Sequence, residues 1–306
     1  MKQGNNNRLD WPGMAILVVL CASWGIQQVA IKVAISGISP VLQSGIRSMG
    51  ATVLLLIWMA IRRQHVLERD GTLWWGVAAG LLFAGEFLLI YLGLQFTNAS
   101  RAVIFLYMSP FVVAVGAQFF IPGDQLTRHQ ICGLCLAFVG ILVAFNESLG
   151  MPSGRILLGD TMLVGAAVLW GATTVLIKAG PLIRISPAKT LLYQLGVSAL
   201  VLPLGSLVMG EAGIHDVSLL VAASMTYQVV WVAFITYLTW FWLVKRYSIS
   251  RLASFTFLTP LFGVLAGGLL LNGAITTKLV ASLVLVGLGI YLVNRPGSSP
   301  RPLPGS

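Results

Sequence analysis

WGIQQVAIK, residues 24–32, returns 146 positions later as WGATTVLIK, residues 170–178. A second match follows 150 positions apart, between residues 100–110 (SRAVIFLYMSP) and residues 250–260 (SRLASFTFLTP). Because the two matches come in the same order in both halves, we interpret the chain as two copies of one unit.

Both copies lie in apolar sequence that is long enough to cross a lipid bilayer. A spanning helix needs about 20 mainly apolar residues. We expect ten such helices, at 14–35, 40–61, 72–95, 101–121, 127–146, 156–178, 187–208, 218–244, 251–271 and 275–294. Five spans per copy is an odd number, so the second copy is inverted relative to the first. The sequence therefore predicts an all-α membrane protein with ten transmembrane helices as two inverted five-helix repeats, an architecture typical of carriers.

These spans divide the chain into five segments. We expect a cytoplasmic N-terminal segment at 1–13, a first five-helix repeat at 14–146, an outer connecting loop at 147–155, a second five-helix repeat at 156–294, and a disordered cytoplasmic tail at 295–306. None of these stretches is long enough or polar enough for a separate soluble domain.

The composition excludes a soluble enzyme with a buried sheet. Hydrophobic residues make up 57% of the chain and charged residues 9%, whereas a soluble domain has about 25% charged residues. The net charge of +10 could suggest nucleic acid as a partner, but the basic residues lie mostly at the ends of apolar runs. The expected partners are therefore the lipid bilayer and a small-molecule substrate, with no nucleic acid, for a monomer or a homodimer.

The same basic residues predict the orientation. With both termini in the cytoplasm, the inner segments hold most of the Lys and Arg residues, and the outer segments hold only Arg101, Arg155 and Lys278. Cytoplasmic loops of membrane proteins carry this excess of positive charge. We expect a multi-pass protein of the plasma membrane (the bacterial inner membrane), with both termini cytoplasmic.

Several motifs resemble the EamA family of the drug/metabolite transporter superfamily. They are the Trp-Gly pair in the first helix of each half, residues 91–102 (YLGLQFTNASRA) between the third and fourth helices, and a proline in each fourth helix. The resemblance covers roughly residues 14–294. It implies a secondary active transporter that works by alternating access.

The resemblance specifies the fold better than the substrate. It implies export of small amphipathic metabolites, such as amino acids or related compounds, or of drugs. The alternative is a carrier of nucleotide sugars or other anionic metabolites, which related branches transport. Small multidrug exporters of this superfamily carry a glutamate in helix 1, where this chain has Trp24, Gln27 and Gln28. Their proton-coupling residue therefore cannot be carried over, and although no cofactor is expected, proton coupling stays open.

Two polar stripes predict a binding site. Trp24, Gln28 and Lys32 are spaced four residues apart, so they share one face of the first helix. The sixth helix repeats the stripe as Trp170, Thr174 and Lys178. The alternative is that the tryptophans pack in the core and the lysines extend to the two interfaces. Duplication of polar groups that lipid disfavours supports the binding site.

Three aromatic residues and one acid complete the predicted binding site. Tyr107 in the fourth helix and Tyr227 and Trp231 in the eighth lie away from the interfaces, where aromatic residues usually gather. Glu86 lies deep in the third helix, where an ionisable group costs at least a few kcal/mol unless it is paired, protonated or hydrated. It either serves the substrate or protons, or forms a structural ion pair with Lys32 or Arg47.

Pro110 and Pro260 are the expected hinges. A proline in mid-helix removes a backbone hydrogen bond and bends the helix, and matched bends suit paired gating helices. A static kink is the alternative. The sequence holds no recognisable catalytic or metal-binding set, because His65, His129 and His215 have no Ser or Cys partner at a recognisable spacing. An intramembrane enzyme or a non-transporting scaffold is therefore disfavoured.

Overall fold

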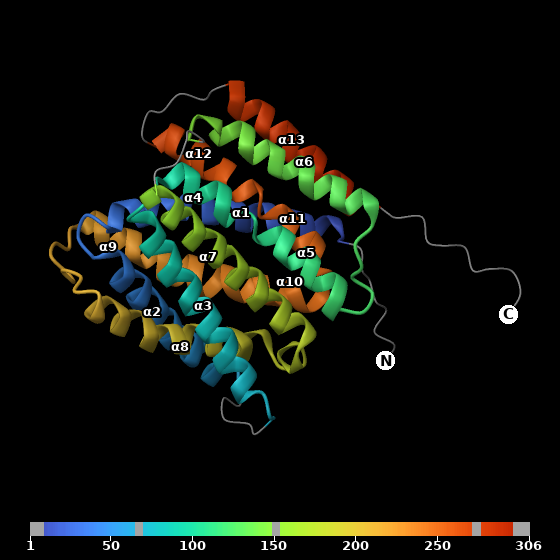
Figure 1. Cartoon of the computed structure of the whole chain (residues 1–306). Helices are drawn as coiled ribbons and strands as arrows, with labels where there is room; N and C mark the ends of the chain where they lie inside the picture. Colours follow the sequence, from blue (N-terminus) through green and yellow to red (C-terminus); the bar gives the residue numbers. More distant parts are fainter. Residues whose placement is uncertain (1–8, 65–69, 149–153, 271–276, 296–306) are drawn as a thin grey trace, which may run out of the picture.

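The computed structural model describes residues 9–64, 70–148, 154–270 and 277–295, and nearly all of them are helical (Figure 1). Ten stretches of the described chain are helical, long and apolar enough to cross a membrane. This confirms the prediction of an all-α protein with ten transmembrane helices. Most of the expected N-terminal segment, most of the connecting loop and nearly all of the tail lie outside the described residues.

Each half of the chain supplies five spans. The first half has α1 (Trp11–Ala34), α2 (Pro40–Ile61), α3 (Leu73–Leu94), α4 (Ala99–Leu106) with α5 (Ser109–Phe120), and α6 (Arg128–Phe145). The second half has α7 (Gly154–Ala179), α8 (Pro187–Val208), α9 (Leu219–Thr226) with the π-helix η3 (Tyr227–Thr236) and α10 (Tyr237–Arg246), α11 (Ile249–Phe255) with α12 (Leu258–Leu270), and α13 (Thr277–Asn294). Short 3₁₀ turns, η1 (Asn146–Ser148) and η2 (Pro181–Ile183), follow α6 and α7.

Contacts between helix ends agree with an inverted arrangement of the two halves. We call the end of the bundle where α1 begins the proximal end, and the end where α1 finishes the distal end. At the proximal end, Asp10 accepts a hydrogen bond of 2.6 Å from Tyr247, just after α10. At the distal end, Arg101 in α4 donates at 3.2 Å to Asp160 near the start of α7. Thus α1 and α7 begin at opposite ends.

The first helix begins earlier than expected. It starts at Trp11 instead of residue 14, because the Asp10 side chain accepts a hydrogen bond of 2.9 Å from the Gly13 amide and caps the helix. Pro12 occupies the first turn, where its missing N–H is not needed.

The fourth and ninth spans are interrupted instead of merely bent. α4 ends at Leu106 and α11 ends at Phe255, and new helices begin at Ser109 and Leu258. In each case a proline, Pro110 or Pro260, lies in the first turn of the new helix, and its ring would clash with the carbonyl four residues earlier if the preceding helix continued. The matched breaks bear out the expected distortion, while the hinge function stays a prediction.

The repeated Trp-Gly pairs bring the two halves together. A Cβ atom added at Gly25 would lie 2.7 Å from the backbone nitrogen of Gly263 in α12, and one added at Gly171 would lie 2.5 Å from the Val112 side chain in α5. The first helix of each half therefore packs closely on a helix of the other half that has a proline in its first turn: α1 packs on α12, and α7 packs on α5. In contrast, α6 and α13 lie side by side along one edge of the molecule (Figure 1).

A candidate substrate cavity between the halves

A cavity of about 200 Å³ lies where the two halves meet. Helices α1, α3 and α4 of the first half and α7, α8, α10 and α12 of the second supply its walls. Its aromatic lining consists of Trp24, Phe83, Phe87, Tyr91, Tyr107, Trp170, Tyr237, Trp240 and Phe241. Its polar lining consists of Gln27, Gln28, Glu86, Thr173, Thr174, Gln194 and Thr259.

The structure brings six of the eight sequence-predicted binding residues to this cavity. They are Trp24, Gln28, Glu86, Tyr107, Trp170 and Thr174. The tryptophan and the middle polar residue of each predicted stripe therefore line the same cavity, whereas Lys32 and Lys178 do not. Whether these residues bind a substrate stays a prediction.

The two repeated tryptophans take part in different contacts. Trp24 Nε1 donates a hydrogen bond of 2.9 Å to the Thr236 hydroxyl, and its ring stands edge-on to Tyr237 and Trp240, with centroids 6.3 and 5.5 Å away. The Trp170 ring stands edge-on to Tyr107, at 5.9 Å. Such edge-to-face pairs are favourable between aromatic rings and hold the cavity walls in defined positions.

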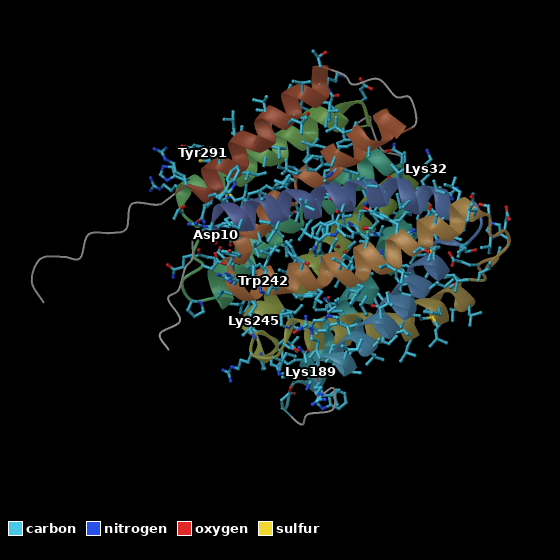
Figure 2. The ribbon with its side chains drawn as sticks, turned by 180° about the vertical axis from the view of Figure 1, so that it is seen from behind. Asp10, Lys32, Lys189, Trp242, Lys245 and Tyr291 are labelled. Atoms are coloured by element: carbon cyan, nitrogen blue, oxygen red, sulfur yellow. The ribbon has the colours of Figure 1, made fainter. Side chains whose placement is uncertain are left out.

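Glu86 reaches the cavity without a direct partner. Its side chain is 7% exposed, and its carboxylate makes no hydrogen bond or ion pair within the described parts of the chain. The alternative of a structural ion pair with Lys32 or Arg47 is therefore not realised in this structure. Lys32 is exposed, and Figure 2 shows it at the opposite end of α1 from Asp10.

Tyr227 and Trp231 do not line the cavity. Tyr227 donates a hydrogen bond of 2.9 Å to the Ser23 carbonyl, and Trp231 Nε1 donates one of 2.9 Å to the Ser23 hydroxyl. The cause is η3, because each turn of a π-helix holds more residues than an α turn. Side chains on either side of η3 thus do not follow the α-helical spacing used for the prediction, and the aromatic residues of α10 face the cavity instead.

Sequence reasoning missed several lining residues that carry a recognisable signal. Phe83, Phe87 and Tyr91 are spaced four residues apart, so they share one face of α3, and Glu86 lies beside this face, three positions after Phe83. Gln27 and Thr173 precede the polar residues of the two stripes. Gln194 is a polar residue in the middle of α8, but its position does not indicate which neighbouring helix it meets.

The cavity is closed at the proximal end. Its deepest lining residues there, Ile177 and Phe241, are 2% and 8% exposed. Beyond them, Lys178 does not extend to the interface but donates hydrogen bonds of 2.6 and 2.8 Å to the carbonyls of Val244 and Tyr247. These bonds satisfy backbone oxygens at the end of α10, so this lysine stabilises the closed end.

Lining residues toward the distal end are accessible. Leu94, the last residue of α3, is 37% exposed, and Gln28 is exposed as well. A polar side chain that lines a cavity and is exposed is suited to contact with water. The cavity therefore opens toward the distal end.

Acidic residues in loops join the halves at both ends. At the proximal end, Lys189 donates a hydrogen bond of 2.7 Å to Asp70, and this interaction, together with hydrogen bonds from Thr72, lowers the pKa of Asp70 to about 2. At the distal end, Glu211 accepts bonds of 3.0 and 2.9 Å from the amides of Val41 and Leu42 at the start of α2, where the helix dipole favours negative charge.

Comparison with known proteins agrees with this architecture. The EamA-like transporter family matches residues 11–146 and again residues 157–295. The chain is 28% identical to a probable amino-acid metabolite efflux pump of Salmonella typhimurium, over 91% of this chain and 93% of the pump. It is 24% identical to an uncharacterized transporter, YoaV, of Bacillus subtilis, over 88% and 92% of the two chains.

A solved crystal structure shares the fold. It superposes with a TM-score of 0.78 at 16% sequence identity and covers 91% of this chain and 94% of its own. The family profile matches both halves in turn, and the cavity lies at their junction. On these grounds the chain belongs to the EamA-like transporter family and is a multi-pass membrane transporter.

Proposed function

We propose that the protein is a secondary active exporter of small amphipathic metabolites, in the class of amino acids and related compounds. The cavity between the two halves carries this proposal, because carriers with inverted repeats bind their substrates near the bilayer midplane at the repeat interface. The efflux-pump relative in Salmonella supports the direction of transport.

Alternating access explains why the cavity is closed at one end only. Ile177 and Phe241 seal the proximal end, while Gln28 and Leu94 are exposed toward the distal end. If the excess of basic residues places the proximal end in the cytoplasm, this structure has its cavity open to the outside of the plasma membrane. The mirrored conformation would open the proximal end and load substrate from the cytoplasm.

The lining favours an organic ammonium group with an apolar body. Aromatic faces attract cations, and Glu86 is the acid that lines the cavity in the described structure. No lysine or arginine of the described chain is among the lining residues. A nucleotide sugar would need several positive groups for its phosphates, so the lining disfavours the anionic alternative.

Glu86 is suited to couple transport to protons. A carboxyl group in a largely apolar cavity is neutral or charged according to what occupies the cavity. Release of a proton when an ammonium group binds, and its return when the ammonium group leaves, would join export to a proton gradient. The coupling thus rests on one side chain that both substrate and protons reach.

Transport by the purified protein in proteoliposomes tests the proposed function. We expect uptake of a radiolabelled amino acid from a mixed panel to exceed that of protein-free liposomes and to change when a pH gradient is imposed. Lys32→Gln is the matched control, because this side chain is exposed at the end of α1 and does not line the cavity. Uptake equal to that of protein-free liposomes for amino acids, amines and drugs alike would contradict the proposal.

A further inference from the structure

Arg47 of α2 is a buried cation whose hydrogen-bonding capacity is mostly unused. Its side chain is fully buried, and its Nη2 donates a bond of 3.1 Å to the Ser44 hydroxyl. Nε and Nη1 have no hydrogen-bond partner, and no carboxylate lies within 4.0 Å of it, in the part of the chain that the structure describes. One helical turn earlier, Gln43 Oε1 is also buried without a partner.

Such an arrangement is costly. A guanidinium removed from water loses its hydration and regains stability only through hydrogen bonds or an opposite charge. Arg47 has one hydrogen bond and one aromatic ring in place of that counter-charge. Side chains kept in this state within a membrane are typically part of a substrate or ion pathway.

Arg47 lies directly behind one wall of the cavity. Its guanidinium carbon is 4.4 Å from the centroid of the Phe87 ring, and Phe87 lines the cavity. Its charge interacts with Glu86 and Tyr91, which also line the cavity. The Phe87 ring therefore contacts the unsatisfied cation and also lines the cavity.

Phe87 has a ring partner along the cavity wall. Its ring stands edge-on to Phe83 at 5.0 Å, and Phe83 stands edge-on to Tyr237 at 6.2 Å. Phe87 itself is only partly buried, in contrast to Arg47. Rotation of this one aromatic side chain would expose the guanidinium to a ligand in the cavity.

We propose that Arg47 is a concealed subsite that binds the carboxylate of a zwitterionic substrate when the Phe87 ring turns aside. The inference rests on the proposed function, because it assigns the second charged group of the substrate in the same cavity. Glu86 faces the ammonium group, and Arg47 pairs with the carboxylate through the end-on fork of Nη1, which has no other partner among the described residues, and the second N–H of Nη2. Two N–H donors in a fixed fork match the two oxygens of a carboxylate.

This arrangement makes a specificity prediction that does not depend on transport. A ligand with both charges satisfies both groups, whereas a ligand without the carboxylate leaves Arg47 unpaired. A hydrogen bond between charged groups contributes enough to change affinity by about tenfold or more. The site should therefore prefer a free amino acid to its methyl ester or its decarboxylated amine.

The test is binding to the purified, full-length protein in nanodiscs. Leucine, leucine methyl ester and isopentylamine are titrated, followed by phenylalanine, its methyl ester and phenethylamine. Tryptophan fluorescence reports occupancy, because Trp24, Trp170 and Trp240 line the cavity. We expect each free amino acid to bind about tenfold more tightly than its ester and its amine.

Variants of Arg47 locate this preference. Arg47→Gln should weaken binding of the free amino acids about tenfold and leave binding of the amines unchanged. The affinity of Arg47→Lys for free amino acids should lie between those of the wild type and Arg47→Gln. Phe87→Leu should keep the preference, since it removes the ring but not the cation. Arg62→Gln is the matched control, because Arg62 directly follows the same helix, its guanidinium carbon lies 5.7 Å from the Trp58 ring centroid, and its side chain is exposed.

Three results would overturn the inference. The first is a wild-type protein that binds esters and amines as tightly as free amino acids, or that binds neither free amino acid. The second is an Arg47→Gln variant that loses amine binding to the same extent. The third is recovery of free amino acid binding in Arg47→Gln combined with Glu86→Gln, which would make Arg47 the counter-charge of Glu86. If the binding preference holds while proteoliposomes transport nothing, the proposed function fails and the subsite stands.

Discussion

Helix α3 and the span made of α9, η3 and α10 occupy matching places in the two halves, yet they meet the cavity in different ways. In α3, Glu86 presents a carboxylate without a direct partner. Its counterpart 150 positions later, Thr236, is 1% exposed and accepts a hydrogen bond from Trp24. Past Thr236, the aromatic residues of α10 close the proximal end.

This difference separates what the duplication kept from what each half acquired. Both halves retain the Trp-Gly pair that packs on the opposite half and the break before a proline. The charged side chains in and behind the cavity, Glu86 and Arg47, belong to the first half, and the residues that seal its closed end belong to the second. The packing contacts between the halves are therefore repeated, whereas the charged groups and the residues that close the cavity each occur in one half.

The comparison of α3 with the span of α9, η3 and α10 holds only if the two halves are inverted. Cysteine labelling tests this inversion with an all-or-none result. In a background without the native cysteines, Arg62→Cys and Arg184→Cys should be protected from an impermeant reagent added to intact cells. His215→Cys, in the exposed segment between α8 and α9, should be labelled. Labelling of either arginine position would overturn the predicted orientation.

Replacing the charge that distinguishes α3 should have the largest effect on transport. Glu86→Gln keeps the size of the side chain but removes its proton exchange, a contribution that is typically about a hundredfold in rate. We expect transport to fall by that order while thermal unfolding is unchanged, since the carboxylate has no ion pair among the described residues to lose. Thr239→Val serves as the control in the other half, because Thr239 belongs to α10 and does not line the cavity. A folded Glu86→Gln variant with normal rate and pH profile would exclude the functional role.

Removal of either repeated tryptophan should reduce transport less. Trp24→Ala and Trp170→Ala each remove an aromatic wall with its edge-on partners, and we expect about a tenfold loss in transport because an aromatic pair contributes up to about 1.5 kcal/mol beyond its buried area. Expression and thermal stability measured in parallel separate binding from packing. If both variants merely misfold, these tryptophans are structural and the site assignment loses its main support.

A smaller substitution tests the difference between these two tryptophans. Trp24→Phe loses the hydrogen bond to Thr236, whereas Trp170 makes no hydrogen bond through its ring nitrogen among the described residues. We expect Trp24→Phe to lower the free energy of unfolding by about 1 kcal/mol more than Trp170→Phe. Denaturation of both variants in the same detergent provides the measurement, and equal stability would show that the Thr236 bond contributes little.

The smallest expected effect concerns Asp70, whose partner Lys189 lies in the other half. The pKa of this carboxyl is lowered to about 2, so the stabilisation is present above about pH 4, its usual pKa range, and is lost as pH falls toward 2. Asp70→Asn should cost at most about 1 kcal/mol at pH 7, because the carboxylate is 25% exposed and water screens it. The wild type and the variant should converge in stability at low pH, and a constant difference would contradict this account.

Periodicity and repetition in the sequence predicted most of the frame. The ten spans and the disturbance before Pro110 and Pro260 follow from local rules of helix length and proline geometry. Six cavity residues followed from the polar stripes and from isolated polar or aromatic positions. These predictions required only the spacing of residues within one helix or the internal repeat. They did not require knowledge of which helices are in contact.

The other features of the site depend on contacts between helices, which the residues on one helix face do not specify. Gln194 and Arg47 are placed by the packing of α8 and α2 against α3, which a single sequence does not specify. Tyr227 and Trp231 were assigned by α-helical spacing through a segment that winds as a π-helix. The missing ion pair of Glu86 depends on side-chain reach across two helices, which composition and spacing leave open.

The π-helix also accounts for a discrepancy in the length of the repeat. Leu73 and Leu219, which begin α3 and α9, are 146 positions apart, whereas Arg101 and Arg251 are 150 apart. The second half thus has four more residues than the first between these points, and its span covers Leu219–Arg246 where α3 covers Leu73–Leu94. Wide π turns take up more residues for a given height, so the additional length is stored inside the bilayer and does not lengthen a loop. The longer wall of the second half therefore presents other side chains to the cavity than α3 does, and the wide turns of the π-helix lie at the point where the spacing of the two halves departs.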